Sequence, residues 1–357
     1  MNHFASIQKA LGENGLDAVL LTCQANRFYA SGFQSTGTDG ACLITPAAVC
    51  YWTDGRYIEA AQNQIQGAEV ALTDRANPYK KLFREAVERF GIRKLGFDEQ
   101  AMTVDDHKTY SEALPCEMTG ASEMLAKLRA VKDSGELERM VRAQRIAEKA
   151  LEELKNDIKA GVSERFLAAR LTYLILCGGA ENVSFDPIVV SGTKTSMPHG
   201  VPSDKTLADG DFVTMDFGAL YGGYCSDMTR TVAVGHATEE MERVYDVVYR
   251  AQKAGCAAAR GGVTGRDMDQ AARQVIEDAG YGPYFCHSLG HSVGVEIHEA
   301  PSASQGNPDP LPAGVTVSVE PGIYIPGKFG VRIEDVVILR ENGCENLMKA
   351  PKELLIL

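Results

Sequence analysis

Residues 212–231 read FVTMDFGALYGGYCSDMTRT, and residues 319–337 read VEPGIYIPGKFGVRIEDVV. β-Branched and aromatic residues recur in both stretches, which is typical of strands that pack on a core. Each stretch brings two carboxylates into this apolar setting, Asp216 with Asp227 and Glu320 with Glu334. The likeness of the two segments predicts that distant halves of one domain converge on a single site.

The four carboxylates need compensating charge if their strands are buried. Removing an ionised carboxylate from water costs several kcal/mol unless it is paired or bound to a metal. Arg230 and Arg332 are the basic residues closest to these acids in the sequence. Two divalent cations would neutralise the set better than two arginines could, so the acids predict a dinuclear metal centre. Any one of them taken alone is better explained as a capping, turn or surface residue.

The stretch LGHSVGVEIHEAP (289–301) adds His291 and His298, which are seven positions apart, together with Glu296 and Glu299. His291 would give the carboxylates one neutral nitrogen ligand. An oxygen-rich set with a single nitrogen suits manganese, and it also accepts cobalt or zinc. Taken alone, His298 is better explained as a surface histidine or a hydrogen-bonded core histidine, and the two glutamates receive no role.

Composition limits the classes of partner. The chain has 357 residues, 45% of them hydrophobic, and a formal net charge of −12. This length predicts about two domains. The negative charge disfavours nucleic acids and anionic membranes as partners. The nine cysteines are scattered and form no C-x-x-C pair, and the N-terminal residues do not read as a secretory signal, so we expect a cytoplasmic protein without disulfides.

The pattern of apolar residues predicts two domains with a boundary between residues 124 and 125. Residues 1–124 read as a small α/β domain, with strands near 17–23, 41–45 and 48–54 between helical patterns. Residues 125–357 read as an α+β domain. A long helix within 123–160, with Ser134 as a plausible N-cap, is expected to open it. The other elements expected in this domain are helices near 163–177, 238–259 and 265–279, and strands near 211–218, 224–234, 315–324 and 331–339.

Four motifs of the second domain resemble those of the pita-bread metallopeptidases, a family that includes methionine aminopeptidase, aminopeptidase P, prolidase and creatinase. The motifs are DFG with CSDMTRT (216–231), GH-x6-HE (290–299), VEPGIY (319–324) and GVRIEDVV (330–337). The resemblance implies a pita-bread fold with two divalent cations, Mn²⁺ foremost and Co²⁺ or Zn²⁺ as alternatives. Its implied metal ligands are Asp216, Asp227, His291, Glu320 and Glu334, with Asp227 and Glu334 as the bridging pair.

The first domain narrows the resemblance. NRFYASGF (26–33) and YWTDGRYIEAA (51–61) resemble the first domain of the proline-specific and creatinase-like members. MPHG (197–200) with His199, and IHEAP with His298, resemble the proline-peptidase forms. Methionine aminopeptidases usually have no comparable first domain, and creatinase works without metal. The resemblance therefore favours a proline-specific peptidase.

Catalytic roles follow from the resemblance by position. Glu320 would accept the proton of the attacking water, and His298 would stabilise the oxyanion or protonate the departing proline nitrogen. His199 would contact substrate near the scissile bond. Arg332 would orient a metal-bound carboxylate or hold substrate, although a structural ion pair explains it equally well. The two further positions expected to line the substrate pocket are His287 and Tyr324.

The sequence thus predicts a dinuclear-metal peptidase that releases the first residue of peptides with proline second, as aminopeptidase P does. An Xaa-Pro dipeptidase, or prolidase, is the alternative. A different class of function is a pita-bread domain that binds a partner without catalysis. We expect peptide substrates, no nucleic acid or membrane partner, and a homodimer, which is common among similar proteins.

Overall fold

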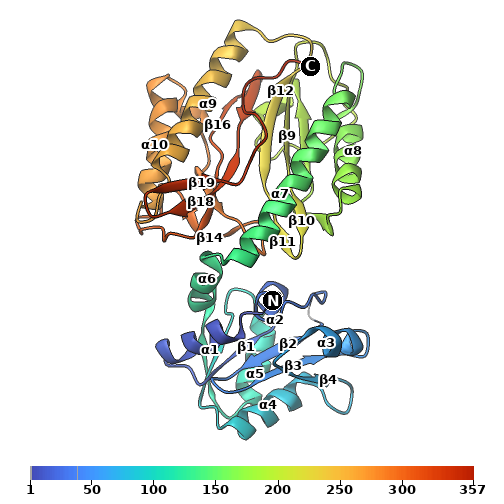
Figure 1. Cartoon of the computed structure of the whole chain (residues 1–357), viewed down its shortest axis with the longest axis vertical. Helices are drawn as coiled ribbons and strands as arrows, with labels where there is room; N and C mark the ends of the chain where they lie inside the picture. Colours follow the sequence, from blue (N-terminus) through green and yellow to red (C-terminus); the bar gives the residue numbers. More distant parts are fainter. Residues whose placement is uncertain (1, 38) are drawn as a thin grey trace. The chain divides into compact units, whose positions relative to one another are not determined.

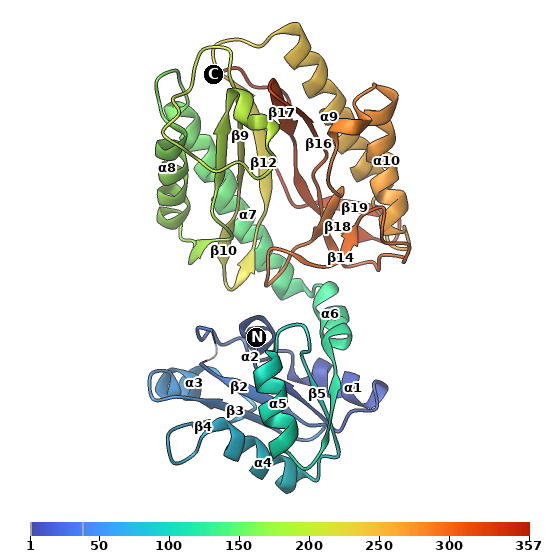
Figure 2. The same ribbon diagram turned by 180° about the vertical axis from the view of Figure 1, so that it is seen from behind.

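The structure is a computed structural model that describes residues 2–37 and 39–357. The chain forms two compact units, residues 1–129 and 130–357. The boundary expected after residue 124 falls inside helix α6 (Ser122–Ala130), and the units divide near the end of this helix. Figures 1 and 2 show the two units from opposite sides.

The first unit is an α/β domain built on a six-stranded sheet with the strand order β4-β3-β2-β1-β5-β6. The expected strands are confirmed as β1 (Ala18–Leu21), β2 (Ala41–Ile44) and β3 (Val49–Thr53), and every residue in them is buried. The remaining strands are β4 (Glu69–Leu72), β5 (Lys94–Phe97) and β6 (Glu117–Gly120). The helices are α1 (Phe4–Glu13), α2 (Gln24–Ser31), α3 (Ile58–Gln64), α4 (Tyr79–Phe90) and α5 (Val104–Ala113), followed by α6.

One helix prediction was wrong. The expected long helix within 123–160 is two helices, α6 and α7 (Ser134–Leu154). Val131 leaves helical geometry to form an isolated antiparallel bridge with Val315. The N-cap is Asp133 rather than Ser134, because its carboxylate accepts hydrogen bonds from the backbone N–H groups of Gly135 and Glu136. A bridge and a cap therefore separate the two helices.

The other three helices of the second unit are confirmed as α8 (Glu164–Cys177), α9 (Glu239–Ala258) and α10 (Gly265–Asp278). In Figure 1, α7 and α8 run together on one side of the unit and α9 and α10 on the other, with the strands between the two pairs. Buried residues of α9 and α10 share one core cluster with strand residues such as Phe212, Val317 and Val337. The unit is therefore a layer of sheets covered by helix pairs, which is the expected α+β arrangement.

The strands form several short sheets. Strands β8 (Ile188–Ser191), β9 (Phe212–Phe217) and β12 (Met228–Ala233) form one antiparallel sheet, in the order β12-β9-β8. A five-stranded sheet has the order β14-β13-β15-β18-β19, and β16 pairs with β17. The bounds of these last seven strands are β13 (Gly290–Ser292), β14 (Glu299–Ala303), β15 (Thr316–Val319), β16 (Gly322–Ile325), β17 (Phe329–Arg332), β18 (Asp335–Arg340) and β19 (Gly343–Asn346). A small three-stranded sheet contains β7 (Asn182–Val183), β10 (Ala219–Tyr221) and β11 (Tyr224–Cys225).

Three strands expected to be continuous are each broken in two. The expected strand at 224–234 is β11 and β12, that at 315–324 is β15 and β16, and that at 331–339 is β17 and β18. At each break the chain leaves one sheet and joins another. Asp227, Glu320 and Glu334 each lie at one of these breaks, between the end of one strand and the start of the next. The change of sheet therefore places three carboxylates where no ladder partner covers them.

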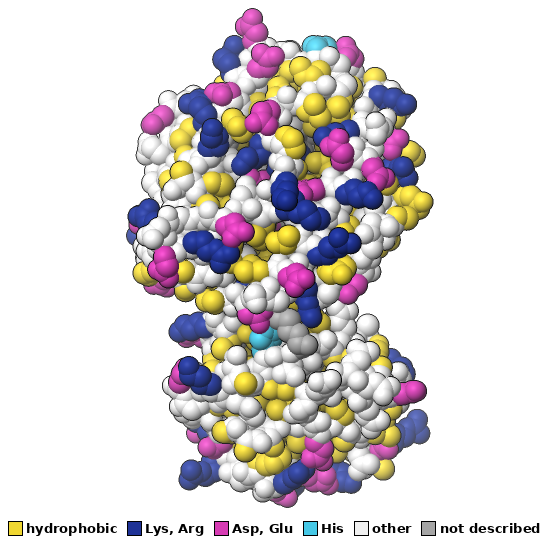
Figure 3. Space-filling model, viewed as in Figure 1, with side chains coloured by type: hydrophobic (Ala, Val, Ile, Leu, Met, Phe, Trp, Pro, Cys, Tyr) yellow, Lys and Arg dark blue, Asp and Glu magenta, His cyan; other side chains and the backbone are white. Residues whose placement is uncertain are grey.

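Acidic and basic side chains are interspersed over the second unit on the face drawn in Figure 3. All nine cysteines, each within the described ranges, are free thiols. Within residues 2–37 and 39–357, no helix combines the length and the apolar character needed to cross a membrane.

Candidate metal centre

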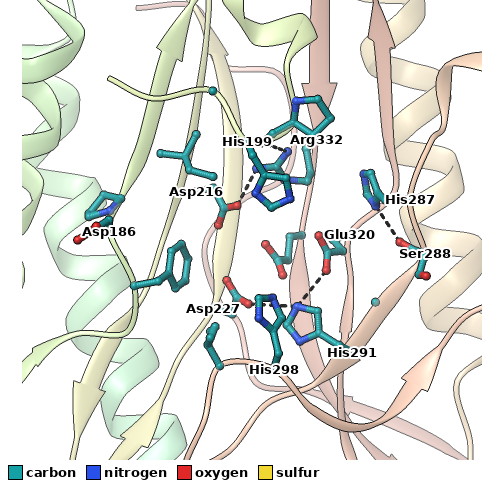
Figure 4. A pocket seen from close by; sticks show the side chains of 18 of the residues that line it. Asp186, His199, Asp216, Asp227, His287, Ser288, His291, His298, Glu320 and Arg332 are labelled. Carbon is teal, nitrogen blue, oxygen red and sulfur yellow. Dashed lines mark hydrogen bonds and ion pairs between the residues drawn. The ribbon is translucent and has the colours of Figure 1, made fainter. Parts of the chain in front are cut away.

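The five predicted metal ligands come together in the second unit, where they line one cavity of about 640 Å³. Asp216 comes from β9 and His291 from β13, and the other three come from the strand breaks. In Figure 4 the side chains of Asp216, Asp227, Glu320 and His291 point toward one another. The expected convergence of the two carboxylate pairs is therefore present in the fold.

His291 presents one ring nitrogen to the carboxylates. Its Nδ1 lies 3.1 Å from the backbone oxygen of Ser292, so the N–H at this position is directed to the backbone. Its Nε2 lies 3.2 Å from Glu320 Oε1 and 3.7 Å from Asp227 Oδ2. A backbone acceptor that fixes the tautomer leaves the opposite nitrogen free to bind a metal, as in many histidine ligands.

Two carboxylate oxygens in this cluster are buried without a hydrogen-bond partner among the described residues, Asp216 Oδ1 and Glu334 Oε1. The other oxygen of each group is held: Arg332 Nη2 donates to Asp216 Oδ2 at 2.6 Å, and Thr229 Oγ1 donates to Glu334 Oε2 at 2.7 Å. One ligand atom each from Asp227, His291 and Glu334 lies within 4.8 Å of the others. Orphaned buried oxygens beside a nitrogen donor are the arrangement that a bound cation would satisfy.

The electrostatics of the cluster also call for positive charge. Burial, followed by the charges of neighbouring acids, raises the pKa of Asp227 and Glu334 well above their usual values. Burial also raises the pKa of Asp216, against the opposing charge of Arg332. Burial acts to raise the pKa of Glu320 too, but the hydrogen bond and charge of His291 outweigh it and lower this pKa to about 2. The three carboxylates with a raised pKa therefore favour a bound proton or cation over the free anion.

Arg332 orients Asp216. Its Nε donates to Thr229 Oγ1 at 3.1 Å, and its Nη1 donates to Tyr324 Oη at 2.9 Å, in addition to the bond from Nη2 to Asp216. The guanidinium is 3% exposed, so most of its donors are committed to the protein. These contacts support the orienting role over a direct hold on substrate.

His287 and Tyr324 occupy different places. His287 lines the cavity, but its Nδ1 is 2.8 Å from the oxygen of Ser288 and its Nε2 is 2.8 Å from Tyr324 Oη. Tyr324 is buried and is not among the residues that line the cavity, which differs from the expected pocket position. Its hydroxyl links Arg332 to His287 from behind the wall of the cavity. The resemblance did not indicate this, because it gave only the position of Tyr324 in a motif and not the partners of its hydroxyl.

His199 and His298 both line the cavity and are exposed to it. The His298 ring stands edge-on to the His291 ring, with centroids 4.4 Å apart and an interplanar angle of 71°. Partial burial and the neighbouring His291 lower the pKa of His298, which favours the neutral imidazole. In Figure 4 His199 and His298 lie on opposite sides of the group of carboxylates.

Sequence reasoning missed the apolar wall of the cavity and the role of Thr229. Thr229 lies two residues after Asp227 in a motif already quoted, and the shared face of a strand is the signal that could have found it. Most of the wall comes from residues outside the quoted motifs, and only Pro198 and Ile297 lie within them. Its apolar members are Phe185, Pro187, Ile188, Pro198, Val201, Pro202 and Ile297.

The residues present fit a pair of divalent cations. Four carboxylates and one imidazole supply oxygen-rich ligands, two of the oxygens are orphaned, and the buried guanidinium of Arg332 holds Asp216 in place. On the basis of this fit, we propose that all five residues are metal ligands.

Comparisons with known proteins give a consistent family. Residues 138–341 match the model of metallopeptidase family M24, and residues 4–131 match that of the creatinase/prolidase N-terminal domain. The Xaa-Pro dipeptidase of Pyrococcus furiosus is 38% identical over 347 residues, which cover 97% of each chain.

Two solved structures are similar over the whole chain. The Xaa-Pro dipeptidase from Bacillus anthracis is 41% identical with a TM-score of 0.94, and 99% of each chain is covered. The X-Pro aminopeptidase from Thermotoga maritima is 37% identical with a TM-score of 0.93, and 100% of each chain is covered. The resemblance read from the four motifs, the α/β first domain and the α+β pita-bread fold are confirmed.

Proposed function

We propose that this chain, which belongs to metallopeptidase family M24, is an Xaa-Pro dipeptidase that uses two divalent cations. The observation that carries the proposal is the meeting of Asp216, Asp227, His291, Glu320 and Glu334 in one cavity that apolar residues also line. An apolar wall suits the proline ring, and a peptide bond to proline has no N–H that the site must satisfy.

The bound cations would lower the pKa of the attacking water and would neutralise the negative charge that develops on the substrate. The residues of the chain would do the rest. Glu320 takes the proton of the water as its oxygen adds to the carbonyl carbon. His298 and His199 donate hydrogen bonds to the oxyanion that forms, and the proton held by Glu320 passes to the proline nitrogen as the C–N bond breaks. Arg332 keeps Asp216 oriented throughout.

The sequence alone favoured aminopeptidase P, and the relatives shift the proposal toward the alternative. The Pyrococcus furiosus relative and the Bacillus anthracis structure both carry the name Xaa-Pro dipeptidase. The Thermotoga maritima structure, named X-Pro aminopeptidase, keeps the second reading open to test. The proposal also includes Mn²⁺ as the working metal, a cytoplasmic location and a homodimer.

Product analysis by mass spectrometry separates these activities. Manganese-loaded protein is mixed in turn with Ala-Pro, Ala-Pro-amide, Ala-Pro-Ala and Met-Ala-Ser. The amide is the matched control, because it differs from Ala-Pro in the charge of the carboxyl end. We expect cleavage of Ala-Pro and at least about tenfold slower cleavage of the amide. A dipeptidase must recognise the free carboxylate after proline, which the amide lacks, and a tenfold loss corresponds to about 1.4 kcal/mol of binding free energy.

Three other outcomes would contradict the proposal, and each would favour a different function. Release of alanine and Pro-Ala from Ala-Pro-Ala, with little cleavage of Ala-Pro, would establish aminopeptidase P activity instead. Removal of methionine from Met-Ala-Ser alone would contradict proline specificity. No cleavage by protein with two bound cations would favour the non-catalytic binding domain.

A further inference from the structure

We propose that Glu299 and Lys132 form a buried ion pair that positions His298, which makes Glu299 a positioning residue of the site. The inference rests on the proposed function, in which His298 contacts the reacting carbonyl. It assigns a role to the one acid of the 289–301 stretch that is both buried and charged, and it adds a residue from the chain just before α7.

The pair is almost completely enclosed. Lys132 Nζ lies 3.1 Å from Glu299 Oε2, and the two side chains are 1% and 4% exposed. Lys132 Nζ also donates to the backbone oxygen of Ala130 at 3.3 Å. An enclosed ion pair gives little net stability compared with apolar residues of the same volume, because both charges lose their hydration. A role in fixing one conformation is the better physical reason for it.

The turn before Glu299 is wrapped around its carboxylate. Glu299 Oε1 accepts a hydrogen bond from the backbone N–H of Glu296 at 3.1 Å, and the Gly294 N–H donates to the Glu296 oxygen at 3.0 Å. A Cβ added to Gly294 would lie 2.5 Å from Glu299 Oε2, so glycine is what lets the backbone approach the carboxylate. The backbone at Gly294 and Glu296 therefore lies against this carboxylate.

The same turn contacts the two segments that carry the proposed ligands Asp227 and His291. The backbone N–H of Cys225, two residues before Asp227, donates to Gly294 oxygen at 2.8 Å. Glu299 pairs with Ser292, the residue after His291, beyond a register shift in the β13–β14 ladder. Glu299 is the first residue of β14 and His298 directly precedes it. Neighbouring side chains in extended chain point to opposite sides, so anchoring Glu299 in the interior directs His298 to the cavity.

The test is a double-mutant cycle on kcat for Ala-Pro hydrolysis by the manganese-loaded protein. Glu299→Gln keeps the shape of the side chain and removes its charge. We expect it to lower kcat about tenfold, while KM and the number of bound Mn²⁺ ions change less than twofold, because small displacements of a catalytic group act on turnover. Glu296→Gln is the matched control, since it makes the same change on the exposed side of the turn, and its kcat is expected within twofold of wild type.

The decisive comparison is made in a His298→Ala background. If Glu299 acts through His298, adding Glu299→Gln to His298→Ala lowers kcat no further. Equal losses in the presence and absence of His298 would overturn the inference, as would an unchanged kcat in Glu299→Gln. If Glu299→Gln fails to fold, Lys132→Met/Glu299→Gln takes its place, because this double variant removes both charges of the ion pair together, and the same outcomes apply.

A second readout does not depend on proline specificity. The ring C–H resonance of His298, assigned by its loss in His298→Ala, is compared in zinc-loaded wild type, Glu299→Gln and Glu296→Gln, because diamagnetic Zn²⁺ does not broaden the signal as Mn²⁺ would. We expect it to shift only in Glu299→Gln, since the ring would move relative to His291. An unmoved resonance would overturn the inference even if Xaa-Pro hydrolysis is confirmed. A protein that cleaves no Xaa-Pro peptide would sink the proposed function and still leave this comparison to decide the positioning of His298.

Discussion

Asp227→Asn is expected to lower kcat/KM for Ala-Pro by about 1,000-fold and to reduce the bound manganese from two ions to one or none per chain. Asp227 lies at the strand break between β11 and β12, 4% exposed, with its Oδ2 3.7 Å from His291 Nε2. An amide keeps the volume but removes the charge and turns one oxygen into a donor, which repels a cation. The loss of one such electrostatic contribution typically costs about 3–4 kcal/mol of transition-state stabilisation.

The measurement pairs metal analysis of purified, dialysed protein with steady-state kinetics. Asp246→Asn on the surface of α9 is the matched control, because it makes the same chemical change at a residue paired with Arg250. Both of its readouts should stay within a factor of two of wild type. Unchanged metal content with full activity in Asp227→Asn would remove Asp227 from the proposed ligand set.

His298→Ala is expected to lower kcat about 100-fold and to leave two manganese ions bound. The ring of His298 contacts that of His291, yet it lines the cavity as an exposed side chain and is not one of the five proposed ligands. One hydrogen-bond donor to an oxyanion contributes roughly 10²- to 10³-fold to rate, and the lower end applies because His199 remains as the second donor. KM should change less than threefold, since the interaction strengthens mainly in the transition state.

The matched control is His236→Ala, which removes an exposed imidazole paired with Asp209. Its kcat should match wild type. If His298→Ala lost metal and turnover in the same proportion, His298 would be a structural support of the metal centre and not a contact of the reacting carbonyl.

Much of the site could be predicted because its residues are charged groups in strongly apolar surroundings. Asp216, Asp227, Glu320 and Glu334 stood out by the cost of burying their charge, and the cavity indeed gathers them with His291. Composition and periodicity also sufficed for three of the four helices of the second unit. These predictions depend only on the residues within one short segment, so the sequence is enough to make them.

What failed depends on contacts between distant segments. The breaks at Asp227, Glu320 and Glu334 arise where the chain passes from one sheet to another, and no residue pattern within a strand reveals its partners. Tyr324 matches a pocket position of the family but is buried, and its hydroxyl contacts Arg332 and His287. The partner of Glu299 was likewise hidden, since Lys132 is 167 residues away in the sequence. Sequence spacing therefore identified the chemistry of the site better than its supports.

The most direct test of a dinuclear Xaa-Pro peptidase is a manganese titration of metal-free protein, followed in parallel by native mass spectrometry and Ala-Pro hydrolysis. Native spectra count the ions on each chain, and the rate reports which loaded form is active. We predict that two ions bind per chain and that hydrolysis rises with their occupancy and is abolished by a chelator. Binding of no manganese, or full hydrolysis in the chelator, would contradict the account.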